Sequence, residues 1–179
     1  MYPYSIENGA GNTLHFLGLR EDESGKYLLL SNELTPGSGP IAHRHKYQRE
    51  ELLVQEGKLA IQIEGQPISY HGPGERVAFE PGVVHRFWNA GDSILKCEGR
   101  VYPPMHFEGY LNVLYESMKE NGGKPSIWVS AYLHCEFFDD TELTAIPGFV
   151  RNVLFPFFYR LGKLLGKFRN IELQPMHAS

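Results

Sequence analysis

Short runs of alternating apolar and polar residues dominate the chain as far as residue 103. Apolar side chains recur at every second position in these runs, which is the period of a strand with one buried face. Turn residues separate the runs, for example Pro36-Gly37-Ser38-Gly39-Pro40 and Gly72-Pro73-Gly74. The expected strands are Leu14–Leu19, Tyr27–Leu34, Glu51–Val54, Leu59–Ile63, Ile68–Tyr70, Arg76–Phe79, Val84–Trp88 and Ile94–Tyr102. Eight strands at this spacing, with no helical period between them, predict an antiparallel sandwich or barrel.

The pattern becomes helical after Pro103-Pro104. From Phe107 to Lys119 apolar residues recur at three- and four-residue steps, and Asn121-Gly122-Gly123 follows as a stop signal. Ser126 is a candidate cap for a second helix that extends to Phe138. We therefore expect a β-barrel domain over residues 1–103 and an α-helical extension over residues 104–179, packed on the barrel or on a partner.

A third helical segment, residues 149–168, is strongly amphipathic, with Pro156 as a kink or a second start. Two interpretations of its apolar stripe remain open. The stripe packs on the other helices or on a second copy of the chain, which would make a homodimer, or residues 149–169 make weak contact with an anionic membrane surface. Charged residues interrupt every apolar stretch, so the segment is too polar to span a bilayer.

Composition and charge narrow the class of protein. The 179 residues are 42% hydrophobic and 21% charged, and the mean hydropathy is −0.32, values typical of a soluble globular domain. The N-terminus lacks the pattern of a signal peptide and only two cysteines occur, so we expect a cytoplasmic protein. The net charge is −4, with five basic residues and one acidic residue after position 148, so the rest of the chain is acidic and nucleic acid is not expected as a partner.

The candidate chemistry lies in two strings of residues. The first contains Gly37, His43-Arg44-His45, Glu50 and Gly57, and the second runs from Gly74 through Pro81-Gly82 to His85 and Asn89. Since residues two apart on a strand face the same way, His43 and His45 can present their imidazoles together. Three imidazoles and a carboxylate suit one divalent transition-metal ion, whether iron, manganese, nickel, copper, cobalt or zinc, and leave a position open for a ligand.

These two strings resemble the paired motifs of the cupin superfamily. The first cupin motif carries His-x-His and Glu and the second carries a further His, so the resemblance places His43, His45, Glu50 and His85 at the four metal-ligand positions. It covers residues 35–90 and implies a mainly β fold, the double-stranded β-helix or jelly-roll barrel, here with C-terminal α-helices. Glu80 departs from the motif, because it stands where the turn usually has a proline.

What the resemblance implies about function is broad, because cupins include dioxygenases, isomerases, decarboxylases and epimerases. Three histidines and one glutamate look most like the metal-dependent oxygenases, so the preferred hypothesis is a metal-dependent dioxygenase for a small molecule, with Glu50 as a metal ligand that also takes a substrate proton. The alternatives are a sugar-isomerase-like cupin and a non-enzymatic module that binds or senses a small molecule or metal. The substrate is not predicted, since fold analogy says little about reaction type.

Overall fold

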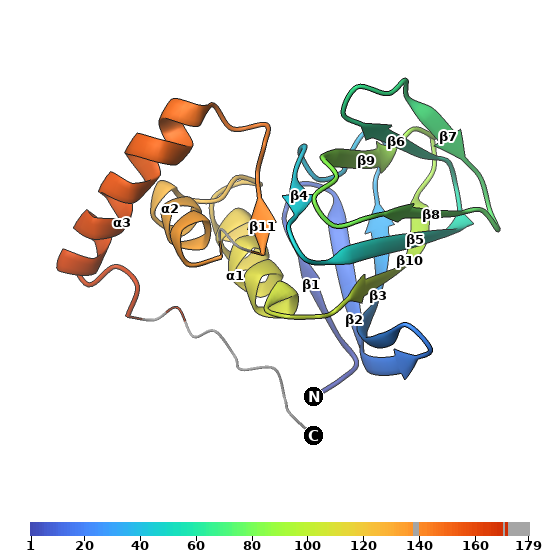
Figure 1. Cartoon of the computed structure of the whole chain (residues 1–179), viewed down its shortest axis with the longest axis horizontal. Coiled ribbons are helices and arrows are strands. Elements are labelled where there is room, and N and C mark those ends of the chain that lie inside the picture. Colours follow the sequence, from blue (N-terminus) through green and yellow to red (C-terminus); the bar gives the residue numbers. More distant parts are fainter. Residues whose placement is uncertain (138–139, 170, 172–179) are drawn as a thin grey trace.

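A body of antiparallel strands forms the N-terminal part of the chain, and helices form the C-terminal part (Figure 1). The computed structural model describes residues 1–137, 140–169 and 171. The strands of the body are β1 (Tyr4–Glu7), β2 (Asn12–Asp22), β3 (Gly25–Leu34), β4 (Arg44–His45), β5 (Arg49–Glu56), β6 (Leu59–Ile63), β7 (Ser69–His71), β8 (Arg76–Phe79), β9 (His85–Asn89) and β10 (Leu95–Tyr102).

Two sheets make up most of this body. Six strands form one sheet in the order β1-β2-β3-β10-β5-β8, and three form the other in the order β7-β6-β9. All of the pairings are antiparallel, and β5 and β10, which are distant in the sequence, lie side by side. The two sheets confirm the antiparallel sandwich or barrel expected from the strand pattern, and the crossing connections confirm the jelly-roll fold that the resemblance implies.

Alternating burial explains why these segments form strands. In β10, Leu95, Cys97 and Val101 are buried. The polar residues of the same strand, Lys96, Glu98 and Arg100, are partly exposed. Gly99 continues the buried row, and a Cβ at this position would lie 2.5 Å from Leu30 Cδ1 on the neighbouring strand β3. A side chain at residue 99 would therefore require the Leu30 side chain to move.

Each expected strand is present, although most strands begin or end up to three residues away from the expected position. Three further short strands are not part of the expected pattern. β1 has four residues, and β4 and β11 (Thr141–Glu142) have two each. β4 and β11 pair with each other, with Thr141 opposite His45 and Glu142 opposite Arg44. Two-residue strands carry no detectable alternation, so this pairing arises only from tertiary packing.

The helical part contains α1 (Phe107–Glu120), α2 (Ile127–Glu136), the π-helical turn η1 (Val150–Leu154) and α3 (Phe155–Leu164). As expected, the Ser126 side chain accepts a hydrogen bond from the Val129 backbone N–H and caps α2, and a new helix starts beside Pro156. The expected end of the second helix, Phe138, lies outside the described residues. Among the residues that the structure describes, no helix is long and apolar enough to cross a bilayer.

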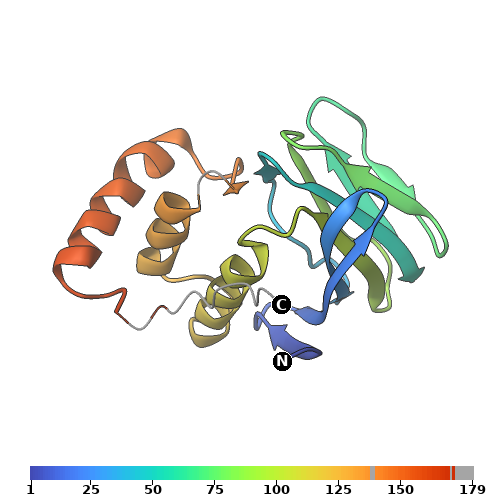
Figure 2. The ribbon, with the colours of Figure 1, turned by 60° about the horizontal axis from the view of Figure 1, so that its bottom comes forward.

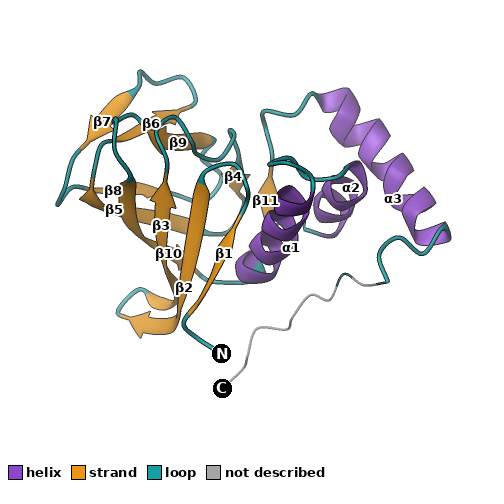
Figure 3. Cartoon of the chain, turned by 180° about the vertical axis from the view of Figure 1, so that it is seen from behind, coloured by secondary structure: helices purple, strands orange, loops and turns teal. Residues whose placement is uncertain are grey.

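The helices lie in sequence outward from the body. α1 lies nearest the strands and α3 furthest away, as Figure 2 shows from below. Phe107 and Tyr115 of α1 share an apolar cluster with Phe16, Leu28 and Val101 of the strands. α2 packs on α1, and α3 packs on α2, around a separate apolar cluster that contains Tyr110, Leu133 and Phe137. β11 lies between helices and body, beside β4 (Figure 3).

Candidate metal centre

Four side chains from different parts of the body meet in its interior. One potential ligand atom from each of His43, His45, Glu50 and His85 lies within 4.8 Å of the others. All four residues are buried, with between 2% and 7% of their surface exposed. These are the four residues that the two sequence strings predict, and they are in a metal-binding arrangement.

Backbone hydrogen bonds position these side chains. His43 and His85 form a two-way bridge, with N–H to oxygen distances of 3.0 and 2.9 Å, which brings the two strings together. His45 is on β4, and its carbonyl accepts a 2.7 Å hydrogen bond from the Gly82 N–H. Gly82 has φ +81°, a conformation that favours glycine, so the turn before β9 needs this residue.

Each of the three histidine rings has a hydrogen-bond partner at Nδ1. His43 Nδ1 lies 2.8 Å from the Ile41 carbonyl oxygen, and His85 Nδ1 lies 2.9 Å from the Val83 carbonyl oxygen. His45 Nδ1 lies 3.2 Å from Thr141 Oγ1. In each ring the other nitrogen, Nε2, is directed at Glu50 Oε2, at 4.0 Å from His43, 3.5 Å from His45 and 3.1 Å from His85.

With neutral imidazoles, this arrangement directs nitrogen lone pairs at the lone pairs of a carboxylate oxygen. A carbonyl oxygen can only accept a hydrogen bond, so His43 and His85 must donate from Nδ1, and a neutral imidazole then has no proton on Nε2. In a neutral ring the Nε2 lone pair then faces a carboxylate oxygen, which is also an acceptor. The 3.1 Å contact of His85 Nε2 with Glu50 Oε2 is a hydrogen bond only where that ring carries a second proton. His45 Nε2 is buried and has no hydrogen-bond partner among the described residues. A cation among these four atoms would remove the repulsion, and second hydrogen bonds of this kind are usual for metal-bound histidines.

The pKa shifts of the cluster favour a neutral His43 and an ionised Glu50. Burial, together with the neighbouring His45 and His85, lowers the pKa of His43 to about 3, so this imidazole is neutral at pH 7. Burial alone would raise the pKa of Glu50, but the His45 and His85 imidazoles outweigh it and hold that pKa below its usual range. A neutral imidazole and an ionised carboxylate are the forms that bind divalent ions.

Apolar side chains border the cluster. Phe79 stacks on the His85 ring with centroids 3.8 Å apart, and Phe107 of α1 meets His45 edge to face at 5.4 Å. Phe79 belongs to the hydrophobic core, together with Leu52, Val54, Ile61 and Phe87, and Ile63 packs against this core. This surface limits the access of water to the imidazoles and strengthens electrostatic interactions between them.

Asn89, at the end of the second string, braces the scaffold. Its side-chain amide donates to the Leu34 and Ser93 carbonyls at 2.8 and 2.7 Å, and its side-chain oxygen accepts from the Gly91 N–H. The side chain is 99% buried and lies on the same face of β9 as His85 and Phe87. Its role in this structure is to hold a turn.

Two residues near the cluster carry no signal in the sequence. Thr141 belongs to the helical part, and its hydroxyl contacts Nδ1 of His45, which lies 96 positions earlier in the chain. Gln48, only 1% exposed, donates to the Pro104 carbonyl, and its side-chain oxygen has no partner in the described part of the chain. Neither stands in a spacing pattern, because the contacts depend on how the helices fold back on the strands.

The remaining histidines and Glu80 lie outside the cluster. His15 and His71 contact exposed polar neighbours, and the His106 side chain is 61% exposed. His134 lies on α2, and His177 is outside the described residues. The Glu80 side chain is 66% exposed and forms an ion pair with Arg49, so it points away from the four ligands. The turn that follows Glu80 keeps its hydrogen bond, from the Val83 N–H to the Glu80 carbonyl.

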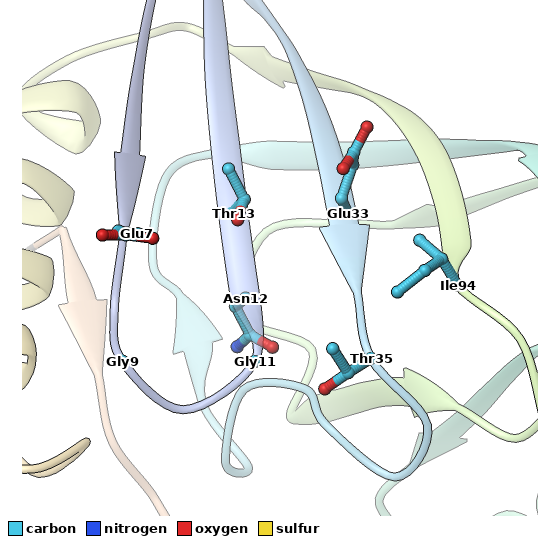
Figure 4. A pocket seen from close by; sticks show the side chains of 8 residues that line it. All are labelled: Glu7, Gly9, Gly11, Asn12, Thr13, Glu33, Thr35 and Ile94. Carbon is cyan, nitrogen blue, oxygen red and sulfur yellow. The ribbon is translucent and has the colours of Figure 1, made fainter.

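A small surface pocket lies elsewhere, at the ends of β1, β2 and β3 (Figure 4). Eight residues line it, namely Glu7, Gly9, Gly11, Asn12, Thr13, Glu33, Thr35 and Ile94. None belongs to the metal-binding arrangement. Glu7 is paired with Lys119 of α1 at 2.6 Å, so one of the two acidic groups at the rim is already neutralised.

Comparison with known proteins gives a family match and distant structural likenesses. Residues 32–98 match a family model described as a cupin domain. No curated protein matches the sequence.

Three solved structures illustrate the likenesses. CapF, the capsular polysaccharide assembling protein of Staphylococcus aureus, shares 22% identity with a TM-score of 0.47, over 55% of this chain and 30% of its own length. A sugar phosphate isomerase from Silicibacter pomeroyi shares 19% identity with a TM-score of 0.47, over 56% of this chain and 71% of its own length. The cupin domain of Cnp3 from Schizosaccharomyces pombe shares 12% identity with a TM-score of 0.42, over 49% of this chain and 63% of its own length. The chain thus spans less than a third of CapF.

Proposed function

Because this chain carries a cupin domain, we propose that it is a metalloenzyme that uses one divalent transition-metal ion to transform a small organic molecule. His43, His45, Glu50 and His85 would hold the ion. The observation that carries the proposal is the convergence of three imidazole Nε2 atoms on the buried Glu50 carboxylate, an arrangement that a cation would stabilise. An ion bound there would supply Lewis-acid chemistry and, with iron, copper or manganese, redox chemistry.

The preferred reaction is oxygen-dependent oxidation of the substrate, as in a dioxygenase. Three nitrogen ligands and one carboxylate suit iron, manganese, nickel, copper, cobalt and zinc, and they leave one or two positions for exchangeable ligands. The apolar side chains around Phe79 would exclude water and favour a substrate with apolar surface.

Glu50 is proposed first as a ligand and second as a group that moves a substrate proton. The low pKa of Glu50 makes the carboxylate a weak base in this environment, which favours the ligand role. A proton-transfer role requires a substrate whose proton is made more acidic by binding. Hydrogen bonds from His43 and His85 Nδ1 to backbone carbonyls would keep the site in place during such a transfer.

Oxygen consumption by the full chain tests the preferred reaction. The chain, loaded with Fe²⁺, Mn²⁺ or Cu²⁺, is incubated with a panel of phenolic and diketone compounds in an oxygen electrode. We expect substrate-dependent oxygen uptake from at least one metal form and none from His85→Ala, while His71→Ala, a histidine outside the cluster, retains it. Turnover of sugar phosphates without oxygen uptake would contradict the oxidation and support an isomerase instead.

A sensing module is the second candidate, and one contact favours it. His45 is hydrogen-bonded to Thr141 of the helical part, so a change at the cluster can reach the helices directly. A tightly bound zinc ion without turnover of any compound in the same panel would support this function over the enzyme.

The proposed partners are a small-molecule ligand and a second copy of the chain. Five apolar side chains near α3 are at least half exposed, namely Phe149, Val153, Phe157, Leu164 and Leu165. Such a stripe is typical of an interface. Exposed Arg160, Lys163 and Lys167 flank it, so weak contact of residues 149–169 with an anionic membrane surface is the competing proposal.

A further inference from the structure

A segment of the helical part closes over the short stretch of chain that carries two of the three clustered histidines, His43 and His45. Residues 140–145, which we name the strap, lie along residues 42–46 of the body. β11 of the strap pairs with β4, the Lys46 N–H donates to the Asp140 carbonyl at 3.3 Å, and the Ala145 N–H donates to the Ala42 carbonyl at 3.1 Å. Asp140, Thr141 and Glu142 are each at most 7% exposed, so the strap is packed into the protein.

Ion pairs fix the strap in register. Glu142 is 6% exposed and lies between Arg44 of β4, at 2.6 Å, and Arg151 of η1. Arg44 stands between His43 and His45 in the sequence, so this anchor acts on the same short segment as the candidate ligands. A buried carboxylate held by two guanidinium groups leaves its neighbour Thr141 little freedom to move.

The His45 ring depends on this strap in a way that the other two rings do not. His43 and His85 each donate to a carbonyl two residues earlier in their own strand segment, at Ile41 and Val83. His45 Nδ1 instead meets Thr141 Oγ1, at 3.2 Å. When Nδ1 donates to the hydroxyl oxygen, the Nε2 lone pair is directed at the centre of the cluster.

We propose that Thr141 is a positioning residue for the metal centre, and that the strap completes the centre by fixing the ring of His45. The inference rests on the proposed metal site and adds that the helical part is required for its full affinity. Outer partners of metal-bound histidines change metal affinity by about 10- to 100-fold, so the contribution of Thr141 is measurable.

Metal titration of full-length variants tests the proposal. The metal-free chain is titrated with Zn²⁺ against a competing chelator, and with Co²⁺ while the visible absorption of the ion is recorded. We expect Thr141→Val, which replaces the hydroxyl by a methyl group of similar size, to bind Zn²⁺ about 10-fold or more weakly and to alter the Co²⁺ spectrum. Thr141→Ser keeps the hydroxyl and restores both affinity and spectrum.

Thr144→Val is the matched control. Thr144 lies on the same strap, and its hydroxyl oxygen has no hydrogen-bond partner in the described ranges, so the same substitution leaves affinity and spectrum unchanged. Thr141→Ala, which adds no volume, gives the same comparison if the valine variant does not fold.

The outcomes separate this inference from the metal site itself. Zn²⁺ binding by the native chain that is lost in His85→Ala, with native affinity and spectrum in folded Thr141→Val or Thr141→Ala, would leave the site standing and overturn the role of Thr141. No Zn²⁺ or Co²⁺ binding by the native chain, or unchanged binding by His85→Ala, would overturn the site and this inference with it.

Discussion

At the scale of single residues, Glu50 and Glu51 differ sharply although they are adjacent on β5. Both are buried, at 6% and 7% exposure. Glu51 is paired with Arg49 at 2.6 Å and Arg76 at 2.9 Å, so its charge is compensated by the protein. Glu50 faces three imidazoles. Two of these rings, His43 and His85, use Nδ1 to donate a hydrogen bond to a backbone carbonyl. The protein therefore supplies two guanidinium partners to Glu51, whereas Glu50 has only imidazole neighbours, and a cation would compensate its charge.

This difference predicts opposite effects of the same substitution. Glu50→Gln replaces a lone pair that faces Nε2 by an amide donor, so the metal-free variant should be more stable than the metal-free native chain by about 1 kcal/mol, while its metal binding is lost. Glu51→Gln, the control, weakens two ion pairs of a buried carboxylate and should destabilise by about 1–3 kcal/mol. Urea unfolding of the metal-free proteins measures both. Equal destabilisation by the two substitutions would contradict this reading of Glu50.

The site residues could be predicted where their spacing follows strand geometry. His43 and His45 are two apart, and His85 stands after the turn residues Pro81-Gly82, so the strings themselves carry the signal. The orientation of Glu80 was not predictable, because the residue follows the last residue of β8, where alternation ends. Thr141 was beyond prediction, since only the tertiary pairing of β4 with β11 brings it to His45.

At the scale of elements, long periodic segments were predictable and short ones were not. β6 and β8 have the bounds expected from their alternation, and α1 ends one residue later than expected. The segment over residues 149–168 was expected to bend or restart at Pro156, and the structure has η1 before α3. The apolar face of this segment is divided, because Phe155 is buried against the helices whereas Phe157 is 56% exposed.

The exposed stripe of α3 predicts self-association. Phe157→Glu places a charge in the stripe without disturbing the buried face, so we expect the dimeric native chain to become monomeric in light scattering, with unchanged helix content. Phe155→Glu is no substitute, because that side chain is buried and the change would unfold the helices. A native chain that is monomeric at all concentrations, and that sediments with anionic vesicles only at low salt, would contradict dimerisation and favour membrane contact.

At the scale of the whole molecule, the proposal links the body and the helices through one short segment. The four candidate ligands come from β4, β5, β9 and the residue before β4, while the helical part adds the strap and the Phe107 ring. The division at residue 103 stays a prediction, because contacts at α1 and at β11 join the two parts closely. A metal ion bound by the native state alone would stabilise the whole chain, by about 2.7 kcal/mol at a hundredfold excess over its Kd.

Elemental analysis of the full chain, purified without chelators, tests the central claim most directly. The account predicts about one transition-metal ion per chain. His43→Ala should lose the ion and keep its strand content by circular dichroism, since the apolar core does not contain this side chain, and His71→Ala should keep the ion. A native chain that binds no such ion even after reconstitution, or a folded His43→Ala variant that retains it, would contradict the account.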